Sequence, residues 1–337
     1  MQHLKLMVPV LVLALLMLLG AVHPIQAQGG QATPVAASLA VVWTTKGGPN
    51  LPFDDPFQLA IDPAGNLWVA DGNNHRFQIF APDGTFLEAW GTEGAGAGEF
   101  DFVDRGLDQT GAVAFGNDAI YGVDPGNDRI QKFTPEREFV LAWGSAGVGE
   151  GQFLHPYDIT LDDQGRVYVI DDRRDDVQVF DGDGSFRFAF AGHGEEPGQL
   201  SDTGGLAIAP DGTIWIADWG SARVQTFAPD GQFLTAFGGP GLAPGRFAGP
   251  IDVAVDGKGR AYVSDVFRYD VQVFDGDGRF LMTLGEYGLK ENQFAQPGGI
   301  AIAADGTIYV SDGGLDRVTA FRPILAMETS VVATADS

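Results

Sequence analysis

An aspartate that recurs at a nearly fixed spacing is the feature that most constrains the fold of this chain. It closes a short apolar run six times, and after a first interval of 53 residues each copy follows the previous one by 47. The six copies are Asp71, Asp124, Asp171, Asp218, Asp265 and Asp312. A period of this size indicates a repeat architecture, in which one supersecondary unit is copied along the chain. The sequence therefore constrains the fold far more tightly than the biochemical function.

Each repeat contains four strand-like runs. β-branched and aromatic residues fill the runs, Gly and Pro supply the turns between them, and no repeat shows helical periodicity. In the fourth copy the runs are residues 206–209, 213–217, 223–227 and 233–237. Six four-stranded units in one chain predict an all-β fold, a six-bladed β-propeller.

The N-terminal part of the chain carries a fourth strand without its first three. Leu39–Trp43 mirrors Phe86–Trp90, whereas the last repeat stops after its third strand, Arg317–Phe321. We expect Leu39–Trp43 to pair with Arg317–Phe321 and close the ring, because closure removes the open sheet edges. The alternative closing strand near Val331 lacks the Asp-Gly turn that precedes the fourth strand elsewhere.

The pattern Ala-Asp-x-x-x-x-Arg-Val-Gln at residues 217–225 resembles the NHL-repeat propellers. Gly-x-Ile-Trp-Ile precedes it at 212–216, and Gly-rich runs such as 144–156 precede the inner strands. The resemblance covers about residues 38–322 and implies an NHL-type propeller of four-stranded blades. It says little about function, because the family includes lyases, RNA binders, protein scaffolds and receptor sensor domains.

An apolar segment at residues 4–22, with Lys5 at its start and Ala27 after it, is typical of a secretory signal peptide. The alternative is an uncleaved anchor, since the segment is nearly long enough to span a bilayer. We expect a secreted or extracytoplasmic protein without stable membrane insertion after cleavage. The expected organisation is a signal peptide at 1–27, a flexible linker at 28–37, the propeller at 38–322 and a C-terminal tail at 323–337.

The composition narrows the range of partners. The chain has 45 Asp+Glu against 20 Lys+Arg, a formal net charge of −25. Such a surface repels phosphate backbones, so nucleic acid is excluded as a partner, although the charge also serves simple solubility. Without cysteine, an exported fold is held by its core alone. We expect a monomer that binds a protein, peptide or glycan ligand.

Sequence variation concentrates on one face of the predicted ring. Strands alternate in direction, so the tight turns share one face, and the second-to-third-strand loops and blade-to-blade loops share the other, here called the variable-loop face. Sites concentrate on variable loops. Six extra residues fall in Asp101–Thr110, and they are either functional or a neutral insertion. The predicted contact residues on this face are Arg105, Arg173, Arg174, Trp219, Phe267, Arg268 and Tyr269.

Arginines accompany the recurring aspartates. In four copies an Arg follows the Asp by five residues, and we expect an ion pair across the loop. Copies three and five instead carry Asp176 and Asp270 there, with Arg174 and Arg268 two residues earlier. These two arginines either pair with Asp171 and Asp265 or bind a ligand.

Asp158 and Asp252 begin two inner strands, at the position that Gln58 occupies in the first copy. Such oxygen ligands at the channel mouth suit Ca²⁺ or Mg²⁺, although a carboxylate at a strand start more often caps nearby N–H groups. No other cofactor is implied. The Asp-Gly-Asp-Gly runs at 181–184 and 275–278 are expected to be hairpin turns and not calcium loops.

Three histidines remain beyond the signal peptide: His75, His155 and His193. Peptidylglycine amidating lyases resemble this fold, and their zinc-binding histidines follow a Pro at inner-strand starts. The residues after those prolines are here Phe57, Tyr157, Ile251 and Gly298. We therefore predict a binding or scaffold module without catalytic zinc. The rival is a metal-assisted lyase or hydrolase at the channel mouth, using Asp158, Asp252 and Tyr157 or His155.

Overall fold

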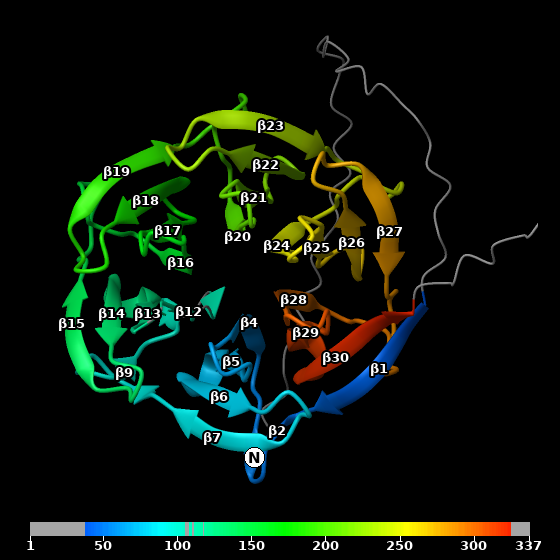
Figure 1. Ribbon diagram of the computed structural model, residues 1–337, viewed down its shortest axis with the longest axis horizontal. Helices are drawn as coiled ribbons and strands as arrows, with labels where there is room; N and C mark the ends of the chain where they lie inside the picture. The colour runs from blue at the N-terminus through cyan, green and yellow to red at the C-terminus, as the bar shows by residue number, and fades with distance from the viewer. Residues whose placement is uncertain (1–37, 105–107, 110, 117, 325–337) are drawn as a thin grey trace, which may run out of the picture. The chain divides into compact units, whose positions relative to one another are not determined.

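The computed structural model describes residues 38–104, 108–109, 111–116 and 118–324. The predicted signal peptide, linker and most of the predicted tail lie outside these ranges. Within them, six four-stranded antiparallel sheets stand as blades around a central axis (Figure 1). The all-β, six-bladed propeller predicted from the repeats is confirmed. No helix in the described ranges is long and apolar enough to cross a membrane.

The strands follow the repeat from the axis outwards. The first blade is β4 (Pro56–Ile61), β5 (Leu67–Asp71), β6 (Arg76–Phe80) and β7 (Phe86–Trp90), and the second is β12 (Val113–Phe115), β13 (Ile120–Asp124), β14 (Arg129–Phe133) and β15 (Phe139–Trp143). The third is β16 (Pro156–Leu161), β17 (Val167–Asp171), β18 (Asp176–Phe180) and β19 (Phe186–Ala191), and the fourth is β20 (Thr203–Ile208), β21 (Ile214–Asp218), β22 (Arg223–Phe227) and β23 (Phe233–Gly238). The fifth is β24 (Pro250–Val255), β25 (Ala261–Asp265), β26 (Asp270–Phe274) and β27 (Phe280–Leu284).

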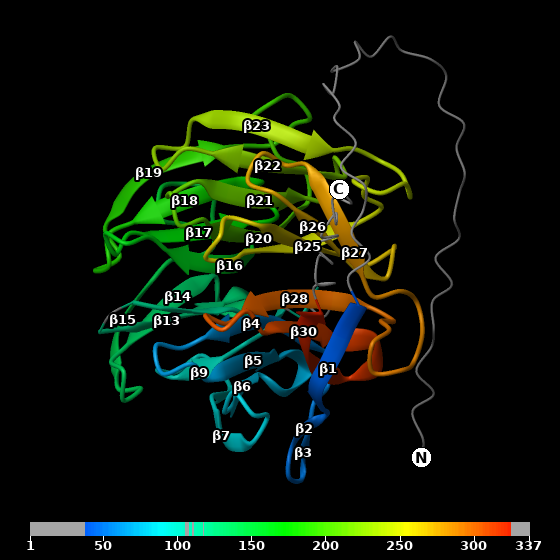
Figure 2. The same ribbon diagram turned by 45° about the vertical axis from the view of Figure 1, so that its right-hand side comes forward.

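The sixth blade joins the two ends of the described chain. It consists of β28 (Pro297–Ile302), β29 (Ile308–Asp312), β30 (Arg317–Ile324) and β1 (Ser38–Thr45). β1 lies antiparallel to β30, with Val41 opposite Phe321 and Thr44 opposite Thr319, and the two strands run side by side in both views (Figures 1 and 2). The predicted closure by the N-terminal strand is confirmed.

Short elements fill the loops. Two-residue strands pair as β2 (Gly47–Gly48) with β3 (Leu51–Pro52), β8 (Thr92–Glu93) with β9 (Glu99–Phe100), and β10 (Val103–Asp104) with β11 (Asp108–Gln109). Three 3-10 turns, η1 (Gly72–Asn74), η2 (Pro125–Asn127) and η3 (Gly313–Leu315), follow the second strands of blades one, two and six.

Apolar side chains pack between neighbouring blades. One core cluster combines Tyr121 and Ile130 of the second blade with Ile159 and Val167 of the third. At the outer strands, an aromatic ring packs on the next blade's Asp-Gly turn, and a Cβ on Gly184 would come within 2.9 Å of the Trp143 ring. Gly184 has a φ of 85°, and its N–H bonds Asp181 O, so the 181–184 run is the predicted hairpin turn.

Candidate functional site

The recurring aspartate fastens each variable loop to its blade. In the fourth blade, Asp218 is fully buried and accepts hydrogen bonds from Ser201 N at 3.0 Å and Gln225 Nε2 at 3.0 Å. Arg223 Nε donates to it at 2.6 Å, which is the predicted ion pair. The Gln225 side chain also accepts a hydrogen bond from Gly198 N and donates one to Gln199 O. This network positions the loops on the variable-loop face and is structural.

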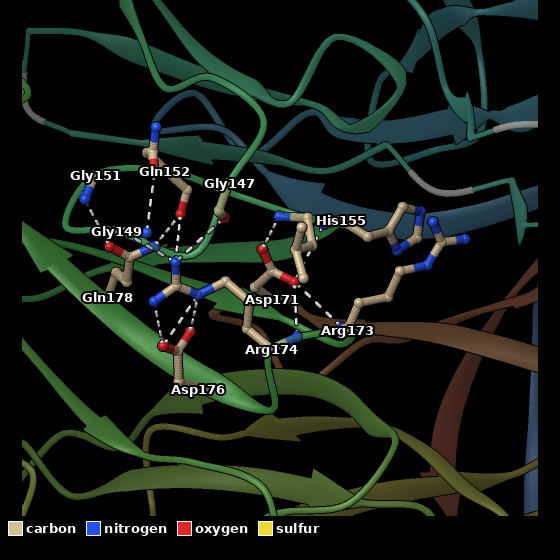
Figure 3. A network of polar contacts seen from close by, with 11 residues as sticks. Gly147, Gly149, Gly151, Gln152, His155, Asp171, Arg173, Arg174, Asp176 and Gln178 are labelled. Carbon is tan, nitrogen blue, oxygen red and sulfur yellow. Dashed lines mark hydrogen bonds and ion pairs between the residues drawn. The ribbon is translucent and has the colours of Figure 1, made fainter.

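Arg174 has a different partner from the one that we expected. Its guanidinium makes a bidentate pair with Asp176, at 3.1 and 2.7 Å, and donates to the carbonyls of Gly149 and Gln152 at 2.9 Å (Figure 3). Asp171 accepts instead from backbone N–H groups, including that of Arg174 at 3.1 Å. Arg174 thus donates to Asp171 through its backbone N–H and to Asp176 through its guanidinium group.

Arg268 repeats this arrangement in the fifth blade. It pairs with Asp270 at 2.9 Å, both side chains being more than nine-tenths buried, while its backbone N–H reaches Asp265 at 3.0 Å. Burial raises the pKa of Asp270, and the Arg268 guanidinium opposes that shift. The predicted ion pairs of Arg174 with Asp171 and of Arg268 with Asp265 are therefore wrong. The two guanidinium groups pair with Asp176 and Asp270 instead. In the third blade, Arg173 is exposed and extends away from Arg174 (Figure 3).

Three other predicted contact residues belong to two ring pairs in the loops of blades four and five and in the connection to blade six. Trp219 lies edge-on to Phe267, with ring centroids 5.8 Å apart, and Tyr269 packs on Tyr287 at 4.8 Å. Phe267 is 51% exposed and Tyr287 65%. We call these four rings the aromatic patch. Arg105, by contrast, lies outside the described residues.

Tyr269 occupies a strained backbone position. Its φ is 61°, in the left-handed region that bulky side chains seldom adopt. The residue before the third strand has this conformation in every blade, but His75, Asp128, Asp175 and Asp316 tolerate it better than Tyr. This conformation therefore belongs to the repeat. Tyr269 is a candidate contact residue because its ring packs on the exposed ring of Tyr287.

Two exposed leucines lie in the blade-to-blade loops, Leu289 in the same loop as Tyr287. Leu242 is 72% exposed and Leu289 73%. Sequence reasoning missed both leucines and Tyr287. A signal was available, because Leu242, Leu289 and Val148 occupy one equivalent position of the Gly-rich loop, 47 residues apart for the two leucines.

The axis is closed on the variable-loop side by three side chains from alternate blades, here called the plug: Phe57, Tyr157 and Ile251. Phe57 packs edge-on against Tyr157 at 5.8 Å, and all three belong to one apolar cluster. Blades one, three and five are not neighbours, so these side chains meet across the axis. Each follows a proline at a register shift of its inner strand, which re-aims the side chain inwards. Gly298 leaves room for Phe57, whose ring would lie 3.1 Å from an added Cβ.

Asp158 and Asp252 lie behind the plug and not at an open mouth, which corrects their predicted placement. Each carboxylate caps two backbone N–H groups. Asp158 accepts from Ile159 N at 2.8 Å and Leu206 N at 3.0 Å, and Asp252 from Val253 N at 2.8 Å and Ile300 N at 2.7 Å. They therefore join the inner strand of one blade to that of the next. The described residues hold no group of three or more His, Asp or Glu side chains arranged for a metal ion.

The histidines are dispersed. His155 is fully buried and pairs with Asp172 at 2.7 Å, whereas the His193 side chain is 78% exposed and pairs with Asp175 at 2.7 Å. His75 accepts a hydrogen bond from Phe102 N at 3.0 Å. Phe102 is fully buried, so this residue anchors the predicted insertion to the core.

The comparisons with known proteins agree with this geometry. A sequence model of the NHL repeat matches residues 53–80. The protein brain tumor of Drosophila melanogaster is 28% identical over 115 residues, 34% of this chain. The same pattern recurs in six four-stranded blades. The chain is an NHL-repeat six-bladed β-propeller. The aligned part of this NHL propeller corresponds to only 10% of the Drosophila protein.

Solved structures share the fold of this NHL propeller at low identity. A catalytically inactive virginiamycin B lyase from Staphylococcus aureus, with quinupristin, is 14% identical at a TM-score of 0.56, over 79% of this chain and 80% of that one. A gluconolactonase from Xanthomonas campestris is 16% identical at 0.59, over 86% and 91%. A Bacteroides thetaiotaomicron protein of unknown function is 15% identical at 0.62, over 86% and 76%. At these identities the likeness shows the fold alone.

Proposed function

We propose that this NHL propeller is a binding module that takes a protein or peptide segment on its variable-loop face. The aromatic patch carries the proposal. Half-exposed aromatic rings held on rigid loops are typical anchors of recognition surfaces, because they bury a large area at a small cost in conformational entropy. Leu242 and Leu289 extend the apolar surface beside them.

The charge around the patch indicates the chemistry of the partner. Glu286, Lys290 and Glu291 are exposed in the loop that carries Tyr287, so these three side chains leave one net negative charge there. Asp202 is exposed next to Ser201, whose carbonyl accepts a hydrogen bond from Gly220 N beside Trp219. Charge complementarity favours a partner that places Lys or Arg around an apolar or aromatic side chain. We therefore propose a basic segment with apolar anchors as the ligand.

The position of the axial carboxylates supports a binding module over a lyase or hydrolase on the variable-loop face. Asp158 and Asp252 are buried behind the plug. A ligand on the variable-loop face meets Phe57 and Tyr157 before it meets either carboxylate. The patch is the better supported site on this face.

Selection of peptides from a random library displayed on phage tests the proposal. The enriched peptides should carry a net positive charge around aromatic or leucine residues, and Phe267→Ala should weaken them about tenfold or more, because it removes an exposed anchor. Leu234→Ala is the matched control, since Leu234 is also 51% exposed but lies on the outer strand β23. Enriched peptides that are not basic, or that bind Phe267→Ala as well as the parent protein, contradict the proposal.

We further propose that the module works outside the cytoplasm, after cleavage behind Ala27. The apolar segment at 4–22 supports this proposal. Expression from the full sequence should give a product outside the cytoplasm that begins at Gln28, as read by mass spectrometry. A membrane-bound product that keeps residues 1–27 would favour the anchor.

A further inference from the structure

A cavity of about 450 Å³ runs along the propeller axis behind the plug. The inner strands of all six blades line it, and most of the lining side chains are Leu, Ile, Val, Ala or Phe. At one equivalent position in the middle of these strands, the lining residues are small. They are Ala60, Val113, Thr160, Ala207, Ala254 and Ala301. Small side chains at this level leave the axis open.

The cavity opens towards the face of the tight turns. At that end the lining residues are half-buried: Ile61, Phe115, Leu161, Ile208, Val255 and Ile302. At the other end, next to the plug, Gln58, Asp158 and Asp252 are buried. The cavity is therefore a channel between mostly apolar side chains, although most of the atoms exposed on its wall are polar, and Gln58, Asp158 and Asp252 lie at its buried end.

The closed end has approximate threefold symmetry within the six blades. Gln58, Asp158 and Asp252 come from blades one, three and five, and glycines occupy the equivalent positions in the other three blades. A Cβ added to Gly205 would overlap Asp252 Oδ1 and lie 3.1 Å from Asp158 Oδ2, so the two carboxylates face each other across this glycine. A Cβ on Gly299 would lie 3.0 Å from Gln58 Oε1.

Among the described residues that line this end, no side-chain cation offsets the charge. None of the residues that line the cavity is Lys, Arg or His. The charge of Asp158 adds to burial in raising the pKa of Asp252. Gln58 is 5% exposed, and its buried Nε2 has no hydrogen-bond partner among the described residues. A buried amide without a partner is costly, so this group also indicates a ligand at the closed end.

We propose that the channel binds a primary ammonium group that carries an apolar substituent. A primary ammonium has three N–H donors around its C–N bond, and here three polar side chains surround the axis. The two carboxylates supply acceptors, and half a turn of the Gln58 amide presents Oε1 as the third. The apolar substituent lies between the Ala, Ile, Leu and Val side chains of the inner strands, towards the open end. This site is distinct from the aromatic patch and does not depend on the proposed function.

Calorimetric titration with three six-carbon probes tests the proposal. n-Hexylamine should bind with one site per chain, and 1-hexanol and hexanoate should bind about tenfold or more weakly, because only the amine pairs with the carboxylates. Equal affinity for hexylamine and 1-hexanol would reduce the site to an apolar cavity and overturn the ammonium assignment. No binding of hexylamine at about 10 mM also overturns it.

Two variants test whether hexylamine binds in the axial channel. Asp252→Asn removes a carboxylate, and Thr160→Phe fills the middle of the channel, so each should weaken hexylamine about tenfold or more. Glu195→Gln is the control, since it removes one exposed negative charge from the variable-loop face and should change nothing. Hexylamine that binds Thr160→Phe as it binds the parent protein lies elsewhere, and the proposal fails. Because Thr160→Phe leaves both carboxylates in place, it decides the question even where Asp252→Asn does not fold.

Discussion

At the scale of single residues, the buried pair of Arg268 and Asp270 shows how a repeat tolerates an exchange of charge. The third-strand position holds an arginine in four blades and an aspartate in two, and the loop arginine of those two blades restores the pair. Truncation of Arg268 leaves Asp270 buried without its cation. Exchanging the positions of the arginine and the aspartate therefore preserves the ion pair, whereas removing one partner alone is destabilising.

We predict that Arg268→Ala lowers the free energy of unfolding by about 1–3 kcal/mol, because it leaves a buried carboxylate unpaired. Urea denaturation measures the loss. The control is Arg279→Ala, whose side chain is 67% exposed and pairs with an equally exposed Asp277, and which should stay within about 0.5 kcal/mol of the parent. A stable Arg268→Ala variant that has lost peptide binding would instead make Arg268 a contact residue.

The axial carboxylates predict a dependence of stability on pH. Burial raises the pKa of Asp158 to about 6, and the pKa of Asp252 is also raised, first by burial and then by the charge of Asp158. For a raised pKa, the stabilisation is complete below the unfolded pKa of about 3.9 and is lost as pH rises through the folded value. As the pH rises from about 4 to about 7, the free energy of unfolding of the parent protein should fall by on the order of 2–3 kcal/mol more than that of Asp158→Asn.

Urea unfolding at several pH values measures this difference, since the other carboxyl groups are common to both proteins. The variant retains Asp252 without its charged neighbour, so part of the dependence disappears with the substitution. Parallel stability curves for the two proteins would show that the axial pair does not titrate in this range.

At the scale of elements, β1 is the strand whose pairing partner is most distant in sequence. It pairs along its whole length with β30, and Trp43 Nε1 also donates to Pro82 O in the turn of the first blade. Deleting residues 28–45 removes the fourth strand of the last blade and exposes the edge of β30. The melting temperature should fall by about 10 °C or more, because both the ladder and the packing of Val41 and Trp43 are lost.

Differential scanning calorimetry checks the deletion against a control that lacks only residues 28–37 and keeps β1. An unchanged melting temperature for the 28–45 deletion would show that another segment closes the ring. The region near Val331, which lies outside the described residues, would then be the candidate.

The strands were predictable because each repeat pairs locally. In the fourth blade, Arg223–Phe227 was predicted with the bounds that the structure has, whereas the inner strand begins at Thr203 and not at Leu206. That difference arises at a register shift between Thr203 and Leu206, which the alternation of side chains does not reveal. The partner of Arg174 was missed for a similar reason, since the loop turns its backbone to Asp171 and its side chain to Asp176.

At the scale of the whole molecule, six similar blades produce a centre with approximate threefold symmetry. Large side chains from blades one, three and five meet in the plug, and Gly298 of the sixth blade leaves space for the Phe57 ring. A linear period of 47 residues shows which positions are equivalent but not which equivalents touch across the axis. The closed channel behind the plug could therefore not be predicted from the spacing, although the residues that form it were identified.

The arrangement at the axis also predicts the zinc content of the protein. We expect less than about a tenth of an equivalent of bound zinc after dialysis against a mild chelator. A zinc site needs at least three protein ligands at about 2.0–2.3 Å from one point. His155 is buried against Asp172, His193 is exposed beside Asp175, and His75 is held by Phe102 N in another loop. The inward positions after the inner-strand prolines hold Phe57, Tyr157 and Ile251, which supply no imidazole. Elemental analysis measures the metal content, and nearly one equivalent that disappears in His155→Ala would promote the metalloenzyme over the binding module.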